Sequence, residues 1–411
     1  MTLDEFIREH ENDDTSALLL ARHRFPDIDI DLAVTTIECR RRLRRKVPSW
    51  YAVPSLRFPC RLAAEQCSSE ETALVKARVA HSIAAEGRRI ADLTGGMGVD
   101  CWAFSRVFRE VQYNEMQPAL AEATQENLGK LGVTNVRFSC RQLVPEDSMD
   151  KPWNDGKASL PANAGNLKEI LGGFRPDLIF LDPARRAEDG RKVFRLADCQ
   201  PDVLTLLPEL MDACPDLLLK FSPMADITQL SRELPGLRAV TVVGAGGECK
   251  ELLLHIRRDY NGPYALTVME NGATLSFDAD DRGCLGETLA SQRLLFEPGK
   301  ALAKAGVFRQ LASRFGLAQA GSSTHLYFAE SIPEALLPFG KVFQIEEVLP
   351  LGNETYRSLR KRIPAAEITA RNLPLTSDAL RRKLGIASGG TKHLFGLRTP
   401  SGNLLLVTTP L

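Results

Sequence analysis

The chain has 411 residues, a length that suggests two to four domains of roughly 100–200 residues each. Its hydrophobic content of 44% and charged content of 25% are typical of a globular protein, and 52 basic residues balance 52 acidic ones, so net charge gives no indication of a nucleic-acid partner. No apolar run is long enough to span a bilayer, the amino terminus is polar, and the nine cysteines have no metal-ligand spacing. We therefore expect a cytoplasmic protein with reduced thiols, without a disulfide framework or a metal site.

Residues 1–87 show helical patterns and no strand pattern, which predicts an N-terminal helical segment. Asp31 is the expected N-cap of its longest helix, which Pro48 ends. A later helix is predicted to begin with a capping box from Ser68 to Glu71. Its expected buried stripe consists of Leu74, Ala77, His81 and Ala84, so His81 is interpreted as a core residue.

From residue 88 to residue 260 short apolar runs alternate with helical stretches. The runs are 90–93, 111–113, 136–138, 178–181, 217–221, 239–243 and 252–256. Such alternation predicts βαβ units and a sheet that is buried on both faces. The connection 144–175 is rich in Pro, Gly, Asn and Asp, and we interpret it as a loop with one short helix and a place for an active-site lid.

The remaining chain is predicted to form small α/β modules over residues 261–335 and 341–411. Asn271 and Gly272 are expected to make a type I′ turn between two strands. A helical stretch at 300–315 and a strand at 325–328 complete the first module. In the second module we predict strands 342–348, 366–370, 393–397 and 404–408, and helices 354–362 and 377–384.

The segment "ADLTGGMGVD", residues 91–100, carries the first chemical signal. A strand is predicted to end at Asp92, and a glycine-rich loop then leads into a helix whose first N–H groups are free. A dinucleotide site needs G-x-G-x-x-G, and its third glycine would fall at Cys101. A carboxylate at Asp92 would repel a pyrophosphate and suits a cation, which favours S-adenosylmethionine with its ammonium and sulfonium. The alternative is a purely structural βα turn.

Two further acidic residues follow predicted strands. Glu115 comes about 20 residues after the glycine loop, at a position where a carboxylate accepts hydrogen bonds from ribose hydroxyls, although it could also be a solvated strand end. In "PDLIFLDPARR", residues 176–186, an apolar strand ends at Asp182-Pro183 near the expected ligand crevice. Because Pro183 fixes its backbone and lacks an N–H, neighbouring carbonyls are left to position an acceptor group.

These three segments, in this order, resemble the motifs of class I S-adenosylmethionine-dependent methyltransferases over about residues 89–260. The segments "EQCSSEETALVK", "FEPGKALAKAGVFRQLASRFGL" and "THLYF", with the closing α/β unit, also resemble bacterial members that carry a ferredoxin-like module and a C-terminal THUMP-like domain. The resemblance implies an α/β fold with a Rossmann-like seven-stranded sheet. It also implies S-adenosyl-L-methionine as cofactor, and RNA (tRNA or rRNA) as partner, because THUMP domains are associated with RNA.

The resemblance assigns roles to individual residues. The expected cofactor-binding residues are Asp92, Thr94, Gly95, Gly96, Gly98, Glu115, Met116, Gln142 and Asp182, with Gln142 at the adenine. The expected catalytic residues, which position the acceptor, are Asp182, Pro183 and Arg185.

The reaction is predicted to be a direct methyl transfer, driven mostly by proximity and orientation. Arg185 stands where methyltransferases of exocyclic base amines often have an aromatic residue, which disfavours that acceptor. Transfer to pyrimidine C5 needs a cysteine nucleophile after the fifth strand, where this chain has Ser222. Cys199 and Cys214 are placed in a predicted helical segment and interpreted as packing thiols.

Basic residues cluster at 40–46, 357–362 and 381–383, and residues 341–411 hold eleven Lys or Arg against five Asp or Glu. A positive small domain suits a phosphate backbone. The expected RNA-binding residues are Arg357, Arg360, Lys361, Arg362, Arg371, Arg381, Arg382 and Lys383. The alternative is that these clusters complement helix dipoles, which we favour for 40–46.

Other functions stay open at this point. They are a catalytically inactive RNA-binding protein that retains the fold, a methyltransferase of proteins or small molecules, and an NAD-dependent oxidoreductase.

Overall fold

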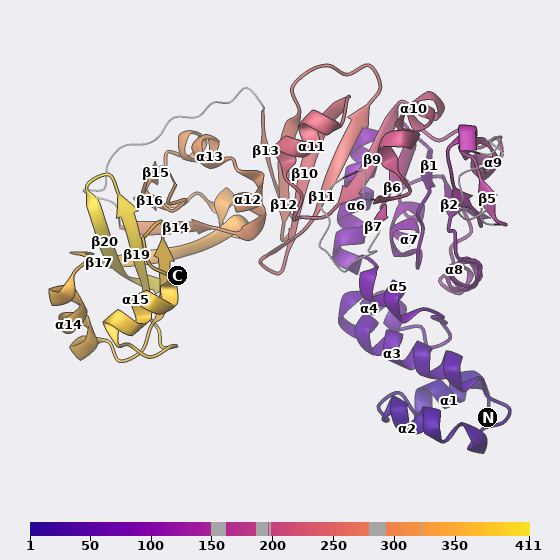
Figure 1. The fold of residues 1–411 in the computed structure, drawn as a ribbon, viewed down its shortest axis with the longest axis horizontal. Coiled ribbons are helices and arrows are strands. Elements are labelled where there is room, and N and C mark those ends of the chain that lie inside the picture. Colours follow the sequence, from indigo (N-terminus) through magenta and orange to yellow (C-terminus); the bar gives the residue numbers. More distant parts are fainter. Residues whose placement is uncertain (149–161, 186–195, 197–198, 279–292, 322) are drawn as a thin grey trace, which may run out of the picture. The chain divides into compact units, whose positions relative to one another are not determined.

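The computed structural model describes residues 1–148, 162–185, 196, 199–278, 293–321 and 323–411 (Figure 1). Two compact units are formed, one by residues 1–240 with 251–262 and the other by residues 241–250 with 263–411. Within the described ranges, no helix combines the length and apolarity needed to cross a membrane. The predicted division of the chain after residues 87, 260 and 335 stays a prediction.

The N-terminal segment contains helices only, as predicted. They are α1 (Leu3–Glu9), α2 (Thr15–Leu20), the 3₁₀ turn η1 (Arg22–Arg24), α3 (Ile30–Lys46), α4 (Pro48–Tyr51), α5 (Arg61–Gln66) and α6 (Glu70–Ile83). Phe6 and Ile7 of α1 pack with Val34 and Ile37 of α3 in one apolar cluster. This cluster joins the first helices to the longest one.

The predicted positions of both N-caps were wrong by one or two residues. The carboxylate of Asp29, not Asp31, accepts the hydrogen bond from Leu32 N at 3.0 Å, because Asp31 already lies inside the first turn of α3. Ser69, not Ser68, caps α6 by accepting from Thr72 N at 3.2 Å. Ser68 is therefore free to turn its hydroxyl into the protein interior.

The predicted buried stripe of α6 was half wrong: Ala77 and Ala84 are buried, but the other two residues are not. His81 is exposed and Leu74 is 37% exposed, so His81 is not a core residue. The buried face of α6 instead consists of Thr72, Ala73, Val75, Lys76, Ala77 and Ala80. A face that contains a lysine and a threonine cannot be recognised from apolar periodicity alone.

A mixed nine-stranded sheet follows, in the order β13-β12-β10-β11-β9-β6-β1-β2-β3. Its strands are β1 (Arg89–Asp92), β2 (Glu110–Asn114), β3 (Val136–Ser139), β6 (Leu178–Leu181), β9 (Asp216–Phe221), β10 (Leu237–Ala245), β11 (Glu248–Arg257), β12 (Ala265–Glu270) and β13 (Ala273–Phe277). The seven predicted strands are all present, and the hairpin adds two more. Strand β11 runs antiparallel to β9, while β9, β6, β1, β2 and β3 are parallel neighbours.

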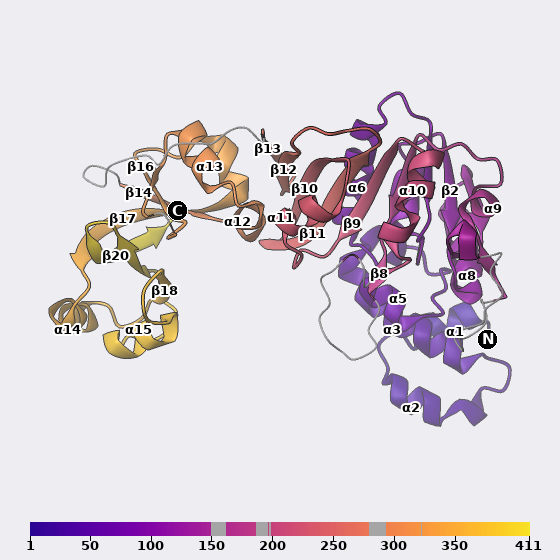
Figure 2. The ribbon, with the colours of Figure 1, turned by 45° about the horizontal axis from the view of Figure 1, so that its top comes forward.

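Helices connect the strands of this sheet, and Figure 2 shows them packed along it. They are α7 (Val99–Ser105), α8 (Pro118–Lys130), α9 (Leu167–Leu171), α10 (Val203–Ala213) and α11 (Ile227–Glu233). Helix α9 is the short helix predicted inside the long connection. The rest of the predicted lid includes residues 149–161, which lie outside the described residues. Asn271 and Gly272 have φ of 50° and 80°, which confirms the type I′ turn.

The second unit contains a seven-stranded sheet in the order β15-β16-β14-β17-β20-β19-β18. Its strands are β14 (Leu294–Pro298), β15 (Ala318–Gln319), β16 (Tyr327–Ala329), β17 (Gly340–Pro350), β18 (Glu367–Arg371), β19 (His393–Thr399) and β20 (Gly402–Pro410). Its helices are α12 (Lys300–Ala305), α13 (Phe308–Phe315), α14 (Asn353–Arg362) and α15 (Ser377–Leu384). The predicted elements of residues 341–411 are thus confirmed.

Strand β14 was not predicted. It pairs antiparallel with β16 on one side and β17 on the other, so partners distant in sequence hold it. Its sequence, "LLFEP", has too short an apolar run to identify a strand. Through β14 the two small modules that the sequence separates share one sheet. Phe328, Phe343 and Phe395 pack in its core.

Candidate active site

The carboxyl ends of three neighbouring parallel strands bring the predicted acidic residues together. Strand β1 lies between β2 and β6, with Asp92 opposite Phe180 of β6 and Tyr113 of β2. Asp182 therefore follows β6, and Glu115 follows β2, at the same edge of the sheet that Asp92 ends. Thr94 links two of the segments, since its Oγ1 accepts a hydrogen bond from Asp182 N at 2.6 Å.

The glycines of the loop after β1 are needed for two separate reasons. A Cβ on Gly95 would lie 2.0 Å from the ring of Tyr113, and one on Gly98 would lie 2.4 Å from Thr124. Gly96 has φ of 52° and would meet nothing within 4 Å, so its outer side is open. Close packing below and open space above Gly96 are what a ligand lying on this backbone requires.

Glu115 is buried and holds the glycine loop against the second strand. Its Oε2 accepts from Gly96 N at 2.9 Å and its Oε1 accepts from Gln117 N at 2.9 Å. A carboxylate has about four lone-pair positions, so each oxygen keeps capacity for a further donor. Both oxygens thus remain suited to the two hydroxyls of a ribose.

Asp92 is the most deeply buried acid of the group, with 1% of its surface exposed. Its Oδ1 accepts from Thr94 N at 3.2 Å, but its Oδ2 is buried and has no hydrogen-bond partner among the described residues. Burial, reinforced by the neighbouring Asp100, raises the pKa of Asp92 well above its usual range. A cationic group placed at Oδ2 would satisfy this oxygen and favour its ionised form, so the site fits the ammonium of S-adenosylmethionine.

Replacing Asp92 with asparagine is expected to stabilise the ligand-free protein and weaken donor binding at least tenfold. The raised pKa means that the contribution of Asp92 to stability is present below its unfolded-state pKa, about 3.9, and is lost as pH rises through its higher folded-state pKa. Asparagine removes that loss at neutral pH. Thermal unfolding with and without S-adenosylhomocysteine, and calorimetric titration of S-adenosylmethionine, measure the two effects. A variant with lower stability and unchanged affinity would contradict both.

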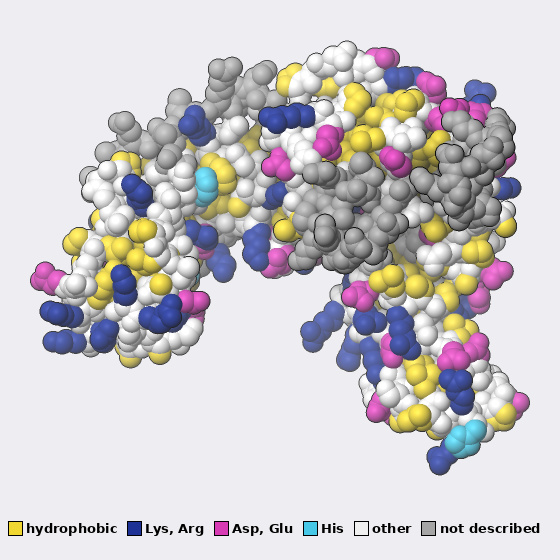
Figure 3. Space-filling view, viewed as in Figure 1, with side chains coloured by type: hydrophobic (Ala, Val, Ile, Leu, Met, Phe, Trp, Pro, Cys, Tyr) yellow, Lys and Arg dark blue, Asp and Glu magenta, His cyan; other side chains and the backbone are white. Residues whose placement is uncertain are grey.

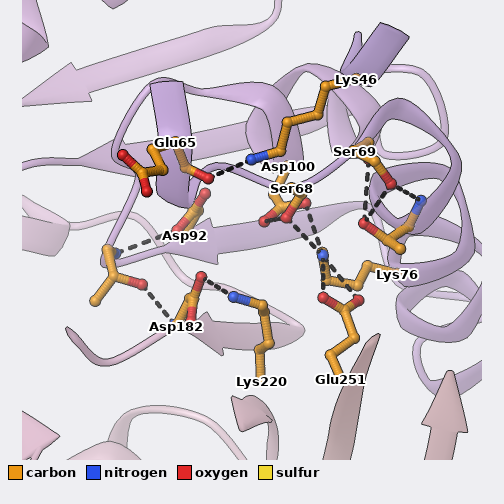
Figure 4. Close-up of polar contacts among 12 residues, drawn as sticks. Lys46, Glu65, Ser68, Ser69, Lys76, Asp92, Asp100, Asp182, Lys220 and Glu251 are labelled. Atoms are coloured by element: carbon orange, nitrogen blue, oxygen red, sulfur yellow. Dashed lines mark hydrogen bonds and ion pairs between the residues drawn. The ribbon is translucent and has the colours of Figure 1, made fainter. Parts of the chain in front are cut away.

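Asp182 forms an ion pair that the sequence did not indicate. Its Oδ2 lies 2.6 Å from Nζ of Lys220, the last residue but one of β9 (Figure 4). Burial alone would lower the pKa of Lys220, but Asp182 and Glu251 outweigh it and raise the pKa above its usual range. The ammonium therefore stays charged beside Asp182. The only signal in the sequence is a lysine inside the apolar strand "LLLKF".

A second lysine of this region, Lys76, is fully buried. Nζ of Lys76 donates to Ser68 Oγ at 2.7 Å and to the two carboxylate oxygens of Glu251 at 2.9 and 3.0 Å, and it lies 3.2 Å from Asp100 Oδ1. Ser68 Oγ in turn donates to Asp100 Oδ2 at 2.8 Å (Figure 4). Lys76 is 0% exposed. The network connects α6 and the residue before its cap to β11 and to the first turn of α7, directly after the glycine loop.

The charges of this region are unequal. Four buried or half-buried carboxylates, from Asp92, Asp100, Asp182 and Glu251, surround two ammonium groups, from Lys76 and Lys220 (Figure 4). The carboxyl groups thus outnumber the ammonium groups, and because burial raises the pKa of Asp92 well above its usual range, a cationic ligand at the strand ends would favour its ionised form.

The remaining predicted site residues are placed as follows. Met116 is 42% exposed, and its carbonyl accepts from Nδ2 of Asn163 at 2.7 Å. Gln142 begins the two-residue strand β4 (Gln142–Leu143), and its N donates to the carbonyl of the same Asn163 at 3.0 Å. Asn163 thus connects both residues that were predicted near the adenine. Pro183 is buried, and the backbone of Arg185 lies in β7 (Ala184–Arg185), while its side chain lies outside what the structure describes.

The two candidate cysteines were wrongly placed in a helix. Cys199 belongs to strand β8 (Cys199–Gln200), which pairs with β7, and Cys214 is the C-cap of α10. Both are buried, as packing thiols would be. In the part of the chain that the structure describes, no cluster of His, Cys, Asp and Glu has the composition of a metal site.

Half of the eight basic residues predicted to bind RNA already have partners in the second unit. Arg360 donates to the carbonyls of Lys383 and Leu384 at 2.9 Å, and so caps the end of α15. Three others pair with acids: Arg362 with Glu347, Arg371 with Glu297 and Arg381 with Glu367. The side chains of Arg357, Lys361, Arg382 and Lys383 are exposed and have no hydrogen bond or ion pair to the described residues.

Comparisons with known proteins agree with this geometry. The chain matches a THUMP domain-like model over residues 340–410 and a ferredoxin-like domain model over residues 294–336. Two proteins of Mycobacterium tuberculosis, from strains CDC 1551 and H37Rv, are named as uncharacterized S-adenosylmethionine-dependent methyltransferases. Each is 27% identical to this chain over 245 residues, covering 57% of this chain and 63% of theirs. The match therefore spans less than two thirds of these curated relatives.

A crystal structure from Porphyromonas gingivalis W83, of a protein described as a methyltransferase, extends the likeness to the whole chain. It is 30% identical, has a TM-score of 0.81, and the alignment covers 99% of this chain and 97% of that one. The chain therefore belongs to the S-adenosylmethionine-dependent methyltransferases, in the group that carries ferredoxin-like and THUMP-like domains.

Proposed function

We propose that this protein transfers a methyl group from S-adenosylmethionine directly to RNA. The observation that carries the donor assignment is the buried Oδ2 of Asp92, which has no partner among the described residues and lies beside an open glycine loop and Glu115. The THUMP-like match and the unpaired basic residues of the second unit support RNA as the acceptor, since THUMP domains are associated with RNA. The nine scattered cysteines, of which the eight described ones form no disulfide, support a cytoplasmic location.

Each residue of the site has a role that follows from its position. Asp92 binds the ammonium end of the donor, Gly96 lies beneath it and Glu115 holds its ribose. When bound, the donor supplies a methyl group that its sulfonium already activates, so the protein mainly needs to orient the acceptor. Asp182 and Pro183 hold that acceptor, and the ion pair with Lys220 fixes the Asp182 carboxylate in one orientation.

The proposal is tested with RNA from a strain that lacks the gene. Purified protein is incubated with methyl-labelled S-adenosylmethionine and with separate RNA, protein and small-molecule fractions, and modified nucleosides are identified by mass spectrometry. Label in one nucleoside of the RNA fraction is the expected result. Label only in the protein or small-molecule fraction would replace RNA as the substrate. Donor binding without transfer to any fraction would favour an inactive RNA-binding protein, and a preference for NAD over S-adenosylmethionine would overturn the donor assignment.

The unpaired basic residues of the second unit are expected to contribute to RNA binding. Replacing Arg357, Lys361, Arg382 and Lys383 together with serine should weaken binding of bulk tRNA and flatten its salt dependence, because fewer counterions are released. Exposed charges contribute within about 0.5 kcal/mol each to stability, so the protein should stay folded. Binding isotherms at several salt concentrations measure the slope.

A matched variant separates charge from structure. Arg362 pairs with Glu347, so replacing both with glutamine removes an ion pair without changing net charge. It should leave the salt slope unchanged. Equal slopes for the wild type and the fourfold variant would show that these four residues do not contact RNA.

A further inference from the structure

The N-terminal helices contain a stretch of unusual charge. Residues 39–64 include eight Lys or Arg and no Asp or Glu. The stretch comprises the second half of α3, all of α4 and the beginning of α5. Such a one-sided composition is typical of a surface that meets a polyanion, provided that the charges are not used inside the protein.

Five of the eight basic side chains do have internal roles. Arg40 is buried and donates to the carbonyls of Tyr51 and Val53 at 3.1 Å, which fixes α4 to α3. Arg41 bonds the carbonyls of Glu11 and Asp13, and Lys46 bonds that of Ala64. Two pair with acids from outside the stretch, Arg57 with Asp4 and Arg61 with Glu38.

Three arginines remain. Arg42, Arg44 and Arg45 are exposed, and none of their side chains has a hydrogen bond or an ion pair to the described part of the chain. Figure 3 shows Lys and Arg side chains gathered over α3 and α4, on the flank of the N-terminal helices. Positive charge at a helix C-terminus complements the dipole, but Lys46 already stands there, and like charges three or four residues apart repel one another. The dipole alone therefore gives little reason for three more arginines.

The position of this end of α3 is the second observation. Lys46 fixes it to the last residues of α5, and two residues after α5 Ser68 donates to Asp100 at 2.8 Å. Figure 4 draws Lys46, bonded to Glu65, in the same view as Asp92, Asp100 and Ser68. The end of α3 that carries the free arginines thus adjoins the carboxyl edge of the sheet, where the donor and acceptor are proposed to meet.

We propose that Arg42, Arg44 and Arg45 form a second RNA-binding surface, which holds the phosphate backbone beside the nucleotide being methylated. The proposal rests on the proposed function, since it takes RNA as the acceptor. It assigns the N-terminal helical segment a substrate-binding role that is separate from the basic residues of the THUMP-like domain. It also predicts that these arginines affect turnover, because they hold the substrate next to the catalytic strand ends.

The test compares two variants of the full-length protein with equal loss of charge. One replaces Arg42, Arg44 and Arg45 with glutamine, which preserves helix propensity. The control replaces Arg8, Arg22 and Arg24, three exposed arginines of α1 and η1 in the same segment. Filter binding of bulk tRNA is measured at several salt concentrations, with donor affinity and thermal unfolding measured in parallel. We expect the first variant to bind at least tenfold more weakly at 0.1 M salt with a flatter salt slope, and the control to change less than twofold.

Each outcome has a distinct meaning. Equal behaviour of the two variants would overturn the surface while leaving RNA methylation intact. Absence of RNA binding and of methyl transfer in the wild type would instead overturn the proposed function, and this surface with it. If the triple variant does not fold, replacing only Arg42 and Arg45, with Arg8 and Arg24 as the control, keeps Arg44 and Lys46 at the helix end and decides the question.

Discussion

Replacing Lys76 with methionine is expected to destabilise the first unit by about 3–5 kcal/mol, the scale measured when one partner of a buried ion pair is removed. Methionine fills a similar volume but leaves Glu251 and Asp100 buried without their shared cation. All three tryptophans of the chain lie within residues 1–240, so their fluorescence in urea reports the unfolding of this unit. A loss below 1 kcal/mol would mean that water or rearrangement compensates for the missing charge.

A double variant isolates the charge from the packing. Replacing Lys76 with methionine and Glu251 with leucine removes the cation together with its closest carboxylate, and should recover more than half of the lost stability. Ser69 offers a structural control, because it caps α6 but is not part of the Lys76 network. Its replacement with alanine should lower the free energy of unfolding by only about 1 kcal/mol.

The pH dependence of this stabilisation has a definite sign. Burial would lower the pKa of Lys76, but Asp100 and Glu251 outweigh burial and raise it. The stabilisation is therefore fully present below the unfolded-state pKa of lysine, about 10.4, and is lost as pH rises through the folded-state pKa. The wild type should lose stability above that pH, whereas the methionine variant should not show this loss.

The site residues that could be predicted from the sequence differ physically from those that could not. Asp92, Glu115 and Asp182 follow short apolar runs, and parallel neighbours place such ends at one edge of a sheet, so their meeting was predictable. Lys76 and Lys220 are long charged side chains on buried faces, where their burial depends on acids far away in the sequence. No local pattern distinguishes them from solvated lysines.

The same distinction applies to the fold. The strands of the first sheet have continuous apolar runs because they are buried on both faces, and all seven were recognised. Strand β14 exists because β16 and β17 pair with it, which is a property of the tertiary structure. The basic clusters were recognised as positive, but Arg360 and Arg362 turned out to be held by Leu384 and Glu347, since only coordinates show which charges already have partners.

Replacing Asp182 with alanine is expected to reduce methyl transfer at least a hundredfold while leaving the dissociation constant for S-adenosylmethionine within a few fold. Asp182 is half-buried at the end of β6, where it touches Thr94 through its backbone N–H and Lys220 through its carboxylate. Its proposed role is to position the acceptor, so the loss should fall on turnover and not on the donor. The measurement is single-turnover transfer of labelled methyl groups to RNA from a strain without the gene, with calorimetry for the donor.

Lys220 provides the control that distinguishes orientation of this carboxylate from its mere presence. In Lys220→Met, the Asp182 carboxylate loses the ammonium 2.6 Å away that orients it, so turnover should fall with little change in donor affinity. Lys220→Arg retains a cation at the same place and should restore part of the rate.

Single replacements of the cysteines with serine should leave the methyl-transfer activity unchanged, because direct transfer requires no covalent nucleophile. A folded, donor-binding cysteine variant without activity would contradict direct transfer, and an Asp182→Ala variant with normal turnover would remove this residue from the acceptor site.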